Sequence, residues 1–326
     1  MDCARQGGGM FEINGGARKI ILPGGAGLVG QNLVTRLKAR GYTNIVVLDK
    51  HAHNLGVLQK QHLDVTAEHV DLAVPGSWDR FFEGTDTVVM LQAQIGAKNR
   101  ETYVRNTVDS TRLVLDAIKR YQVPYTVHIS SSVLESQAED DYTQTKREQE
   151  EMVLVSGVGC IVLRPTLMFG WFDRKHLGWL SRFMQRVPVF PIPGSGKYAR
   201  QPLYVGDFCD IIVKCVDQHR IGGIYNITGM ETVDYIDIIR AIRQTIGAKT
   251  PIVRIPYGLF AGLLRTWGIF DSDPPFTVSQ LKALVTPDVF EVIDWPRIFG
   301  VKATPFATAI QETFLDPTYS KIELKF

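Results

Sequence analysis

Residues 19–41 contain the feature that most constrains the fold of this chain. The segment KIILPGGAGLVGQNLVTRLKARG joins a short β-rich run to a run whose apolar residues have helical spacing. Gly24, Gly27 and Gly30 lie between the two, in the spacing G-x-x-G-x-x-G. Such a loop turns tightly, lets the backbone approach a pyrophosphate and packs the helix against the strand. The segment therefore predicts the first strand–helix unit of a dinucleotide-binding α/β fold.

Two further observations refine the expected ligand. Leu28 and Val29 open the helix, whose free N–H groups would face the pyrophosphate. Asp49 ends the next apolar run, NIVVLD, 19 residues after Gly30. A carboxylate at this distance accepts hydrogen bonds from the adenosine ribose and would repel a 2′-phosphate. The sequence therefore favours NAD over NADP, and NADP stays open because basic residues follow Asp49.

Strand and helix patterns alternate along the first half of the chain. Further strands are expected over 86–91, 123–130 and 159–165, and helices over 105–121 and 145–155. Strands that alternate with helices form parallel sheets with right-handed crossovers. We therefore expect the fold class α/β, a doubly wound parallel sheet (Rossmann fold) with a smaller, discontinuous C-terminal domain.

The pattern loosens after Pro165, where aromatic, proline and glycine residues mix. Strand and helix patterns return near 203–228. We therefore expect a flexible tail over 1–17, an NAD-binding domain over 18–165 plus about 203–228, and a substrate-binding domain over about 166–202 plus 229–326.

One apolar stretch in the last third, YGLFAGLLRTWGIF over 257–270, contains a single charged residue, Arg265. It is too short to span a bilayer. We interpret it as a buried helix, and a helix that faces a partner or a membrane surface is the alternative.

Composition excludes several classes of function. The 326 residues are 45% apolar and 21% charged, as in ordinary soluble globular proteins. The net charge of +2 is too small to predict nucleic-acid binding or membrane binding on its own. Cys3, Cys160, Cys209 and Cys215 have no metal-ligand spacing, so we expect no metal. The absence of a disulfide framework and of a signal-peptide core near the N-terminus leads us to expect a cytoplasmic protein.

The segment DDYTQTKRE contains the candidate catalytic pair, Tyr142 and Lys146. In a helix, residues four apart share one face. Such a pair is a frequent coincidence and decides nothing alone. The run Ser130–Ser132, however, follows the strand expected over 123–130, at the sheet edge where open α/β sheets bind ligands.

With these motifs in this order, the chain resembles the extended short-chain dehydrogenase/reductase family, including nucleotide-sugar epimerases and dehydratases, over residues 19–228. The resemblance implies that Ser132 is the catalytic hydroxyl, with Ser131 the second choice. It implies that Tyr142 is the acid/base and that Lys146 also holds the nicotinamide ribose.

The resemblance also extends the set of cofactor contacts. It implies that Asp71 and Leu72 contact the adenine, and that Leu91, Gln92 and Ala93 lie beside the nicotinamide ribose. Asn106, at the start of NTVDST, matches a family asparagine on the following helix.

A tyrosine base at neutral pH requires its pKa to fall from about 10, which costs ~4 kcal/mol. One ammonium group at ~4 Å supplies about 1 kcal/mol in water and ~4 kcal/mol in a partly shielded site. Lys146, one helical turn from Tyr142, is therefore the expected main cause if the site is shielded. The acidic run Glu139–Asp141 would raise the same pKa if it lay close to the phenol.

The segment PGSGKYARQPLYVGD implies a substrate, because it resembles the family segment in which an arginine binds the pyrophosphate of a nucleotide sugar. Arg200 has that position, and its planar fork suits phosphate oxygens. Two departures concern the same pocket. Leu167 stands where nucleotide-sugar members carry asparagine, and the interval from Ser132 to Tyr142 is shorter than in most sugar epimerases.

Two classes of function follow. The first is an NAD-dependent 4-epimerase or ketoreductase acting on a nucleotide sugar; dehydration is least favoured because only Glu135 follows the serines. Leu167 leaves open a reductase of a non-sugar ketone. The second class is a dinucleotide-binding structural or regulatory protein, because several segments resemble atypical members such as the complex I accessory subunit. The family also suggests a homodimer formed by the helices that follow Asn106 and Tyr142.

Overall fold

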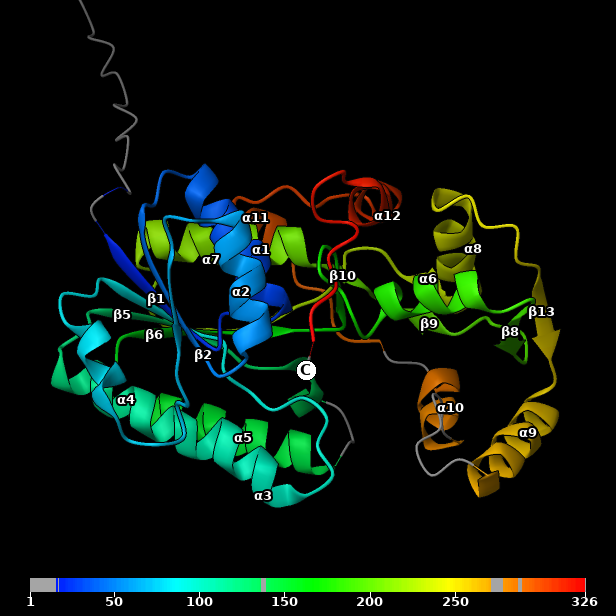
Figure 1. Ribbon diagram of the computed structural model, residues 1–326, viewed down its shortest axis with the longest axis horizontal. Coiled ribbons are helices and arrows are strands. Elements are labelled where there is room, and N and C mark those ends of the chain that lie inside the picture. The colour runs from blue at the N-terminus through cyan, green and yellow to red at the C-terminus, as the bar shows by residue number, and fades with distance from the viewer. Residues whose placement is uncertain (1–15, 17, 136–138, 271–277, 287–288, 326) are drawn as a thin grey trace, which may run out of the picture.

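The computed structural model describes residues 16, 18–135, 139–270, 278–286 and 289–325. Its centre is a seven-stranded parallel sheet in the order β11-β6-β5-β4-β1-β2-β3, with helices on both faces (Figure 1). This confirms the expected doubly wound α/β fold. The tail predicted over 1–17 lies outside the described residues except for Gly16.

The strands of this sheet are short and mostly apolar. Their bounds are β1 Lys19–Pro23, β2 Asn44–Asp49, β3 Thr66–His69, β4 Thr87–Met90, β5 Tyr125–Ile129, β6 Cys160–Pro165 and β11 Ile224–Ile227. The β3 strand, TAEH, lacks the apolar run that marks the others, because it lies at the edge of the sheet and is half exposed. The sequence analysis missed it for that reason.

Two helical layers cover the sheet (Figure 1). One contains α1 Leu28–Ala39, α2 Ala52–Gln61, α7 Val205–Gln218 and α11 Trp295–Phe299, and the other contains α3 Arg100–Tyr103, α4 Ser110–Arg120 and α5 Asp141–Val155. A π-helical turn, Val104–Asp109, joins α3 to α4. A separate apolar cluster lies between each layer and the sheet. The helices expected over 105–121 and 145–155 are confirmed, and α5 begins early enough to contain both Tyr142 and Lys146.

The remaining elements form the second part of the molecule, to the right in Figure 1. Three two-stranded sheets pair β7 Met168–Phe169 with β10 Leu203–Tyr204, β9 Ala199–Arg200 with β12 Val233–Asp234, and β8 Phe190–Pro193 with β13 Ile252–Ile255. The helices are α6 Leu177–Arg186, α8 Tyr235–Thr245, α9 Tyr257–Phe270, α10 Val278–Val285 and α12 Phe306–Leu315. Between elements of the seven-stranded sheet and its helices, short 3₁₀ helices cover Ser77–Phe82 and Ser132–Glu135. The division into an NAD-binding and a substrate-binding domain at the expected boundaries remains our proposal.

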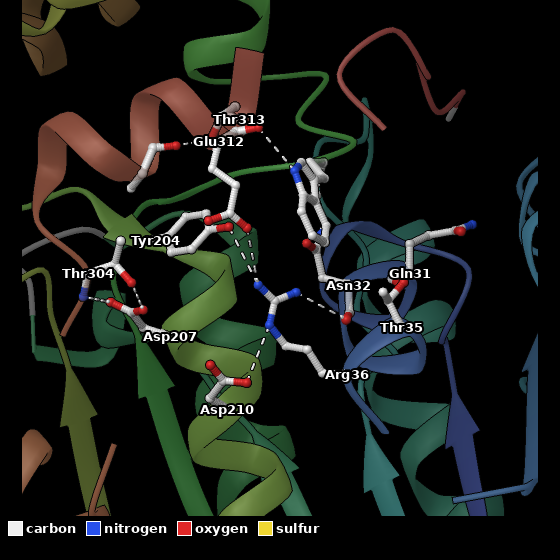
Figure 2. Close-up of polar contacts among 12 residues, drawn as sticks. Gln31, Asn32, Thr35, Arg36, Tyr204, Asp207, Asp210, Thr304, Glu312 and Thr313 are labelled. Carbon is white, nitrogen blue, oxygen red and sulfur yellow. Dashed lines mark hydrogen bonds and ion pairs between the residues drawn. The ribbon is translucent and has the colours of Figure 1, made fainter. Parts of the chain in front are cut away.

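Arg36 links the two parts. Its side chain leaves α1 and reaches Asp210 on α7 at 3.4 Å and Glu312 on α12 at 3.9 Å (Figure 2). The guanidinium also lies 5.1 Å from the centre of the Trp171 ring, an attractive cation–π geometry. Next to it, Asp207 on α7 accepts hydrogen bonds from the backbone and hydroxyl of Thr304. These contacts fix the C-terminal helix α12 against the sheet domain.

The prediction that 257–270 is a buried helix is wrong in one respect. The segment does form the helix α9, but Leu259 and Leu263 are 58% and 55% exposed, and Tyr257 is also exposed. Ala261 is the fully buried residue of its first ten. Within the described residues, no helix is long and apolar enough to cross a membrane.

Candidate functional site

The glycine loop lies where β1 meets α1, and packing alone explains two of its glycines. Gly24 has φ +74°, and a Cβ there would lie 2.5 Å from the backbone of Gln92. A Cβ on Gly30 would lie 2.0 Å from the carbonyl oxygen of Gly25. Both positions therefore require glycine, Gly24 because the backbone after β4 lies against the loop and Gly30 because the helix lies against the loop.

Gly27 is different, because no neighbouring atom explains it. A Cβ on Gly27 would meet only the carbonyl oxygen of Gly24, at 4.0 Å. Gly27 is the N-cap of α1, where no side chain caps the helix and no acidic residue stands in the first turn. Free N–H groups at a helix N-terminus attract an anion. The loop therefore fits a pyrophosphate that approaches the backbone at Gly27, with Leu28 and Val29 in the first helical turn.

Asp49 ties the end of β2 to this loop. Its carboxylate is 6% exposed and accepts hydrogen bonds from the backbone N–H groups of Ala26 and His51, both at 2.9 Å. These bonds fix the carboxylate at the carboxyl edge of the sheet, one strand away from the glycine loop. The position suits a ribose hydroxyl donor and disfavours a second phosphate there.

The residues expected near the adenine lie beyond β3. Asp71 accepts hydrogen bonds from Arg105 at 2.6 Å and from the backbone of Ala73 at 3.0 Å. Burial acts to raise the pKa of Asp71, but the bonds from Arg105 and Ala73 prevail and hold it below its usual value. The side chain of Leu72 is buried in the core under α4. Leu72 would therefore meet a ligand through its backbone.

A buried polar chain runs beneath the end of β4. The Lys146 ammonium is 1% exposed and donates hydrogen bonds to the carbonyl oxygen of Ile129, at 2.9 Å, and to Gln149 Oε1. Gln149 Nε2 donates to the carbonyl oxygen of Gln92 at 3.0 Å and to Thr111 at 2.7 Å. Burial lowers the pKa of Lys146 to about 7, although Glu150 acts to raise it. Lys146 therefore gains or loses its proton near neutral pH.

The sequence analysis missed Gln149 and Thr111. In the sequence they resemble polar residues on helix surfaces, yet both are fully buried. The available signal was the spacing, since Gln149 lies three residues after Lys146 and therefore on the same helix face. The strand-end residues Leu91 and Ala93 flank Gln92, where this chain of hydrogen bonds reaches the β4 backbone.

Tyr142 lies beside the serines that follow β5. Its side chain is hydrogen-bonded to Ser131. Burial raises the pKa of the Tyr142 phenol, the bond to Ser131 opposes this, and the charge of Asp140 adds to it. Ser132 is buried in the 3₁₀ turn that follows. The serine that interacts with the phenol is therefore Ser131, the second choice from the sequence.

The two candidate catalytic residues are not joined in the described structure. The hydrogen bonds of Lys146 go to Ile129 and Gln149, and Lys146 does not contribute to the pKa of Tyr142. The sequence-based expectation that Lys146 lowers the phenol pKa is therefore wrong for this structure. Burial and the charge of Asp140 instead keep the pKa of Tyr142 above its usual value.

Each acid of the run before Tyr142 has a partner. Asp140 is the N-cap of α5 and accepts hydrogen bonds from the backbone N–H and the hydroxyl of Thr143, both at 2.8 Å. Asp141 pairs with Arg100 at 3.2 Å, and Glu139 pairs with Arg147 at 3.8 Å. Asp140 alone among these acids contributes to the raised pKa of Tyr142.

The residues expected on the substrate side have other partners. Arg200 donates to the carbonyl oxygens of Thr286, at 3.0 Å, and of Leu284. It therefore caps the C-terminal end of α10, which favours a positive charge. Leu167 is 40% exposed. Glu135, the one acid directly after the serines, is paired with Arg164, which also binds Glu150.

The remaining matched residue supports the loop after β4. Asn106 donates to the side-chain oxygen of Gln94 at 2.7 Å, and the backbone of Gln94 donates to Thr107 at 3.0 Å. Asn106 lies in the π-helical turn, which is the region of the α3–α4 helix that faces this loop. Its role is therefore to position the loop that follows Ala93.

Fold and site together define an α/β enzyme whose glycine loop, strand-end acid and Tyr/Lys pair surround one edge of a parallel sheet. Comparison with known families agrees. The model of the NAD dependent epimerase/dehydratase family matches residues 20–228. The chain belongs to this family, and it is an enzyme of the extended short-chain dehydrogenase/reductase type.

Relatives within the family have diverged widely. A ceramide reductase of Caulobacter vibrioides is 23% identical over 276 residues, which cover 82% of this chain and 84% of the relative. A 4-hydroxy-2-methyl-3-oxo-4-farnesyl-3,4-dihydroquinoline-1-oxide ketoreductase of Stigmatella aurantiaca is 23% identical, over 73% of this chain and 76% of the relative. The enzyme WbmG of Bordetella bronchiseptica, solved with NAD and UDP, has a TM-score of 0.73 at 16% identity, over 94% of this chain and 98% of that chain. This last likeness concerns the fold.

Proposed function

We propose that the protein is an NAD-dependent ketoreductase that transfers hydride to the carbonyl carbon of a largely apolar ketone. The observation that carries this proposal is the pairing of Tyr142 with Ser131 at the carboxyl end of β5. A phenol whose pKa is raised stays protonated at neutral pH, and a protonated phenol suits the donor role that reduction requires.

The residues proposed to hold the cofactor surround the carboxyl edge of β1, β2 and β4. NAD, when bound, supplies the hydride donor or acceptor. The contacts are assigned to Gly24, Gly27, Leu28, Val29, Gly30, Asp49, Asp71, Leu72, Leu91, Gln92, Ala93, Tyr142 and Lys146. The open cradle at Gly27 and the fixed carboxylate of Asp49 support this assignment. NADP is the less favoured cofactor because Asp49 would repel its additional phosphate.

In the proposed mechanism, the serine hydroxyls hold the ketone oxygen and Tyr142 donates its proton to that oxygen. Ser131 is the first candidate for holding it, and Ser132 is the second. The Lys146 ammonium has three N–H donors and gives two of them to Ile129 and Gln149, so the third can serve a ribose hydroxyl. A charged Lys146 then stabilises the phenolate that Tyr142 leaves behind. Gln149 holds the ammonium in place before the ligand arrives.

The proposed substrate class rests on two residues of the substrate side, Arg200 and Leu167. The Arg200 guanidinium caps α10, so its N–H groups bind backbone carbonyl oxygens and are not available to a phosphate. Leu167 offers apolar surface where the family's nucleotide-sugar members have asparagine. The two relatives described above are named as a ceramide reductase and as a ketoreductase of a farnesyl-substituted dihydroquinoline oxide, which supports an apolar ketone.

A nucleotide-sugar 4-epimerase or 4-keto reductase is the second candidate. The chain follows WbmG over nearly its whole length, and that enzyme was solved with NAD and UDP. In this case Arg200 would have to leave the end of α10 and bind the substrate pyrophosphate. The ion pair between Glu135 and Arg164 occupies the one acid after the serines, which disfavours dehydration.

One experiment separates these candidates. The purified protein is incubated with NADH and long-chain 3-oxo esters, and in parallel with NAD and UDP- or GDP-sugars. Oxidation of NADH with the ketones, and unchanged sugars by mass spectrometry, is the expected result. Conversion of a nucleotide sugar without net NADH consumption would establish the second candidate. NADH binding without turnover of either class would support a structural or regulatory role.

We also propose a cytoplasmic homodimer. The described cysteines Cys160, Cys209 and Cys215 are all free thiols, as a reducing compartment favours. The α5 helix ends in the exposed apolar residues Leu154 and Val155, at one end of the layer expected to pair between subunits. Sedimentation of the wild type and of a Val155→Asp variant tests the dimer.

A further inference from the structure

The outer end of the second part, farthest from the seven-stranded sheet, has a surface that the proposed reaction does not use. It consists of α8, the strand β13 and α9, which follow one another along the right edge of Figure 1. The α9 helix begins two residues after β13 ends, so their surfaces are continuous. We call this surface the α8–α9 end.

Its first component is apolar. Leu259 and Leu263 lie four residues apart, so they share one face of α9, and both are more than half exposed. Val253 and Tyr257 extend the exposed apolar surface toward β13. Arg265 is the one charged residue among the first ten of α9. An exposed helix face with so little charge indicates a surface that contacts a partner or a membrane.

Its second component is cationic. A cavity of about 930 Å³ between α8 and β13 is lined by Arg240, Arg243 and Arg254. Arg240 pairs with Asp237 at 2.8 Å. Across the described ranges, the guanidinium groups of Arg243 and Arg254 have no ion-paired or hydrogen-bonded partner. Lys249, in the loop between α8 and β13, adds a further exposed positive charge.

We propose that the α8–α9 end docks on an anionic lipid surface. The α9 helix lies in the plane of the interface with Leu259 and Leu263 toward the acyl chains, while Arg243 and Arg254 bind headgroup phosphates. Interfacial helices combine an apolar face with basic residues in this way. Arginine suits phosphate because its planar fork binds two oxygens at once.

The arrangement of charge argues against the other occupants. A second copy packed by two-fold symmetry would bring the same arginines of both copies to one interface, where like charges repel. A purely apolar ligand would leave Arg243 and Arg254 without a counter-charge. An anionic membrane satisfies both components, and α9, at about 21 Å for 14 residues, is long enough to lie along it without spanning it.

Vesicle sedimentation tests this docking without substrate or cofactor, so its outcome is separate from that of the proposed reaction. The full-length protein is mixed with phosphatidylcholine vesicles that contain or lack phosphatidylglycerol. We expect binding only to the anionic vesicles, weakened by salt. The double variant R243Q/R254Q should bind about fivefold more weakly for each arginine removed. The double variant L259D/L263D should lose about tenfold or more.

Matched variants elsewhere on the molecule control for net charge and for solubility. K60Q/K119Q removes two exposed positive charges from α2 and α4, and L63D replaces a fully exposed leucine. Both should bind vesicles as the wild type does, and all variants should keep the wild-type melting temperature. Absence of wild-type binding, or equal binding by all variants, would overturn the proposal. A dimer that dissociates in L259D/L263D while vesicle binding is absent would assign the surface to a second copy.

Discussion

The cofactor side and the substrate side of this site are built differently. On the cofactor side, Gly24, Gly30 and Asp49 are fixed by contacts with backbone groups of the glycine loop and of the segment after β4. On the substrate side, Arg200 is bound to carbonyl oxygens of Leu284 and Thr286, more than eighty residues away in the chain. Backbone geometry encoded in a short motif survives wide divergence. Side-chain partners from distant segments do not, so the substrate side is where members of one family acquire different substrates.

The largest expected effect comes from Tyr142, which lies where the two sides meet. In Y142F the proton donor is absent, so turnover should fall by about 10²–10⁴-fold while NADH still binds. Stopped-flow reduction and fluorescence titration of NADH measure the two quantities. Y121F, at the C-cap of α4, serves as the control. Turnover retained in Y142F would remove the phenol from the mechanism.

Lys146 provides the next test, through the pH dependence of stability. Its folded pKa of about 7 lies below the ordinary lysine value of 10.5, so the unfolded chain binds more protons between these values. The free energy of unfolding of the wild type should therefore rise with pH between about 7 and 10, by at most about 1.4 kcal/mol per pH unit. In K146M this rise should be smaller, and part of it should remain because burial also lowers the pKa values of Lys50 and Lys175.

Denaturant unfolding of the ligand-free protein at a series of pH values measures this slope. K119M, which removes an exposed lysine from α4, should keep the wild-type slope. A slope that is the same in K146M and the wild type would mean that the buried ammonium does not lose its proton near neutral pH.

Gly27 sharpens the comparison on the cofactor side. A methyl group at Gly27 meets no neighbouring protein atom closer than 4.0 Å, so G27A should unfold at the wild-type temperature. The same methyl group would stand where the pyrophosphate approaches, so NADH affinity should fall at least tenfold, about 1.4 kcal/mol. G30A, whose Cβ would clash with Gly25, should instead lose stability. G56A, in the interior of α2 where a methyl group has space, should leave NADH affinity unchanged and raise stability slightly.

The same contrast explains what the sequence could predict. The sheet, the glycine loop, Asp49 and the helix with Tyr142 and Lys146 follow from local periodicity and short motifs, which depend on neighbouring residues. The buried hydrogen bonds from Lys146 through Gln149 to Thr111 do not follow from local patterns, because they join residues of different helices.

The sequence also did not predict that α9 is exposed. An apolar run of this length predicts burial only when another element covers it, and coverage depends on tertiary packing. The preference for Ser131 over Ser132 depends on the tertiary position of Tyr142, which interacts with Ser131, while Ser132 begins the 3₁₀ turn. Local patterns place both serines at the site and cannot choose between them.

The smallest expected effect tests the substrate side at Arg200. Since its hydrogen bonds cap α10 and are partly exposed, R200A should lower the free energy of unfolding by about 1 kcal/mol. It should leave the KM for an apolar ketone unchanged, because the guanidinium is engaged with α10. If the substrate is a nucleotide sugar, R200A should instead raise KM or abolish UDP binding. Calorimetric titration with UDP distinguishes the two results, and R240A serves as the control for the loss of an arginine. The titration shows whether the substrate side has departed from the nucleotide-sugar pattern.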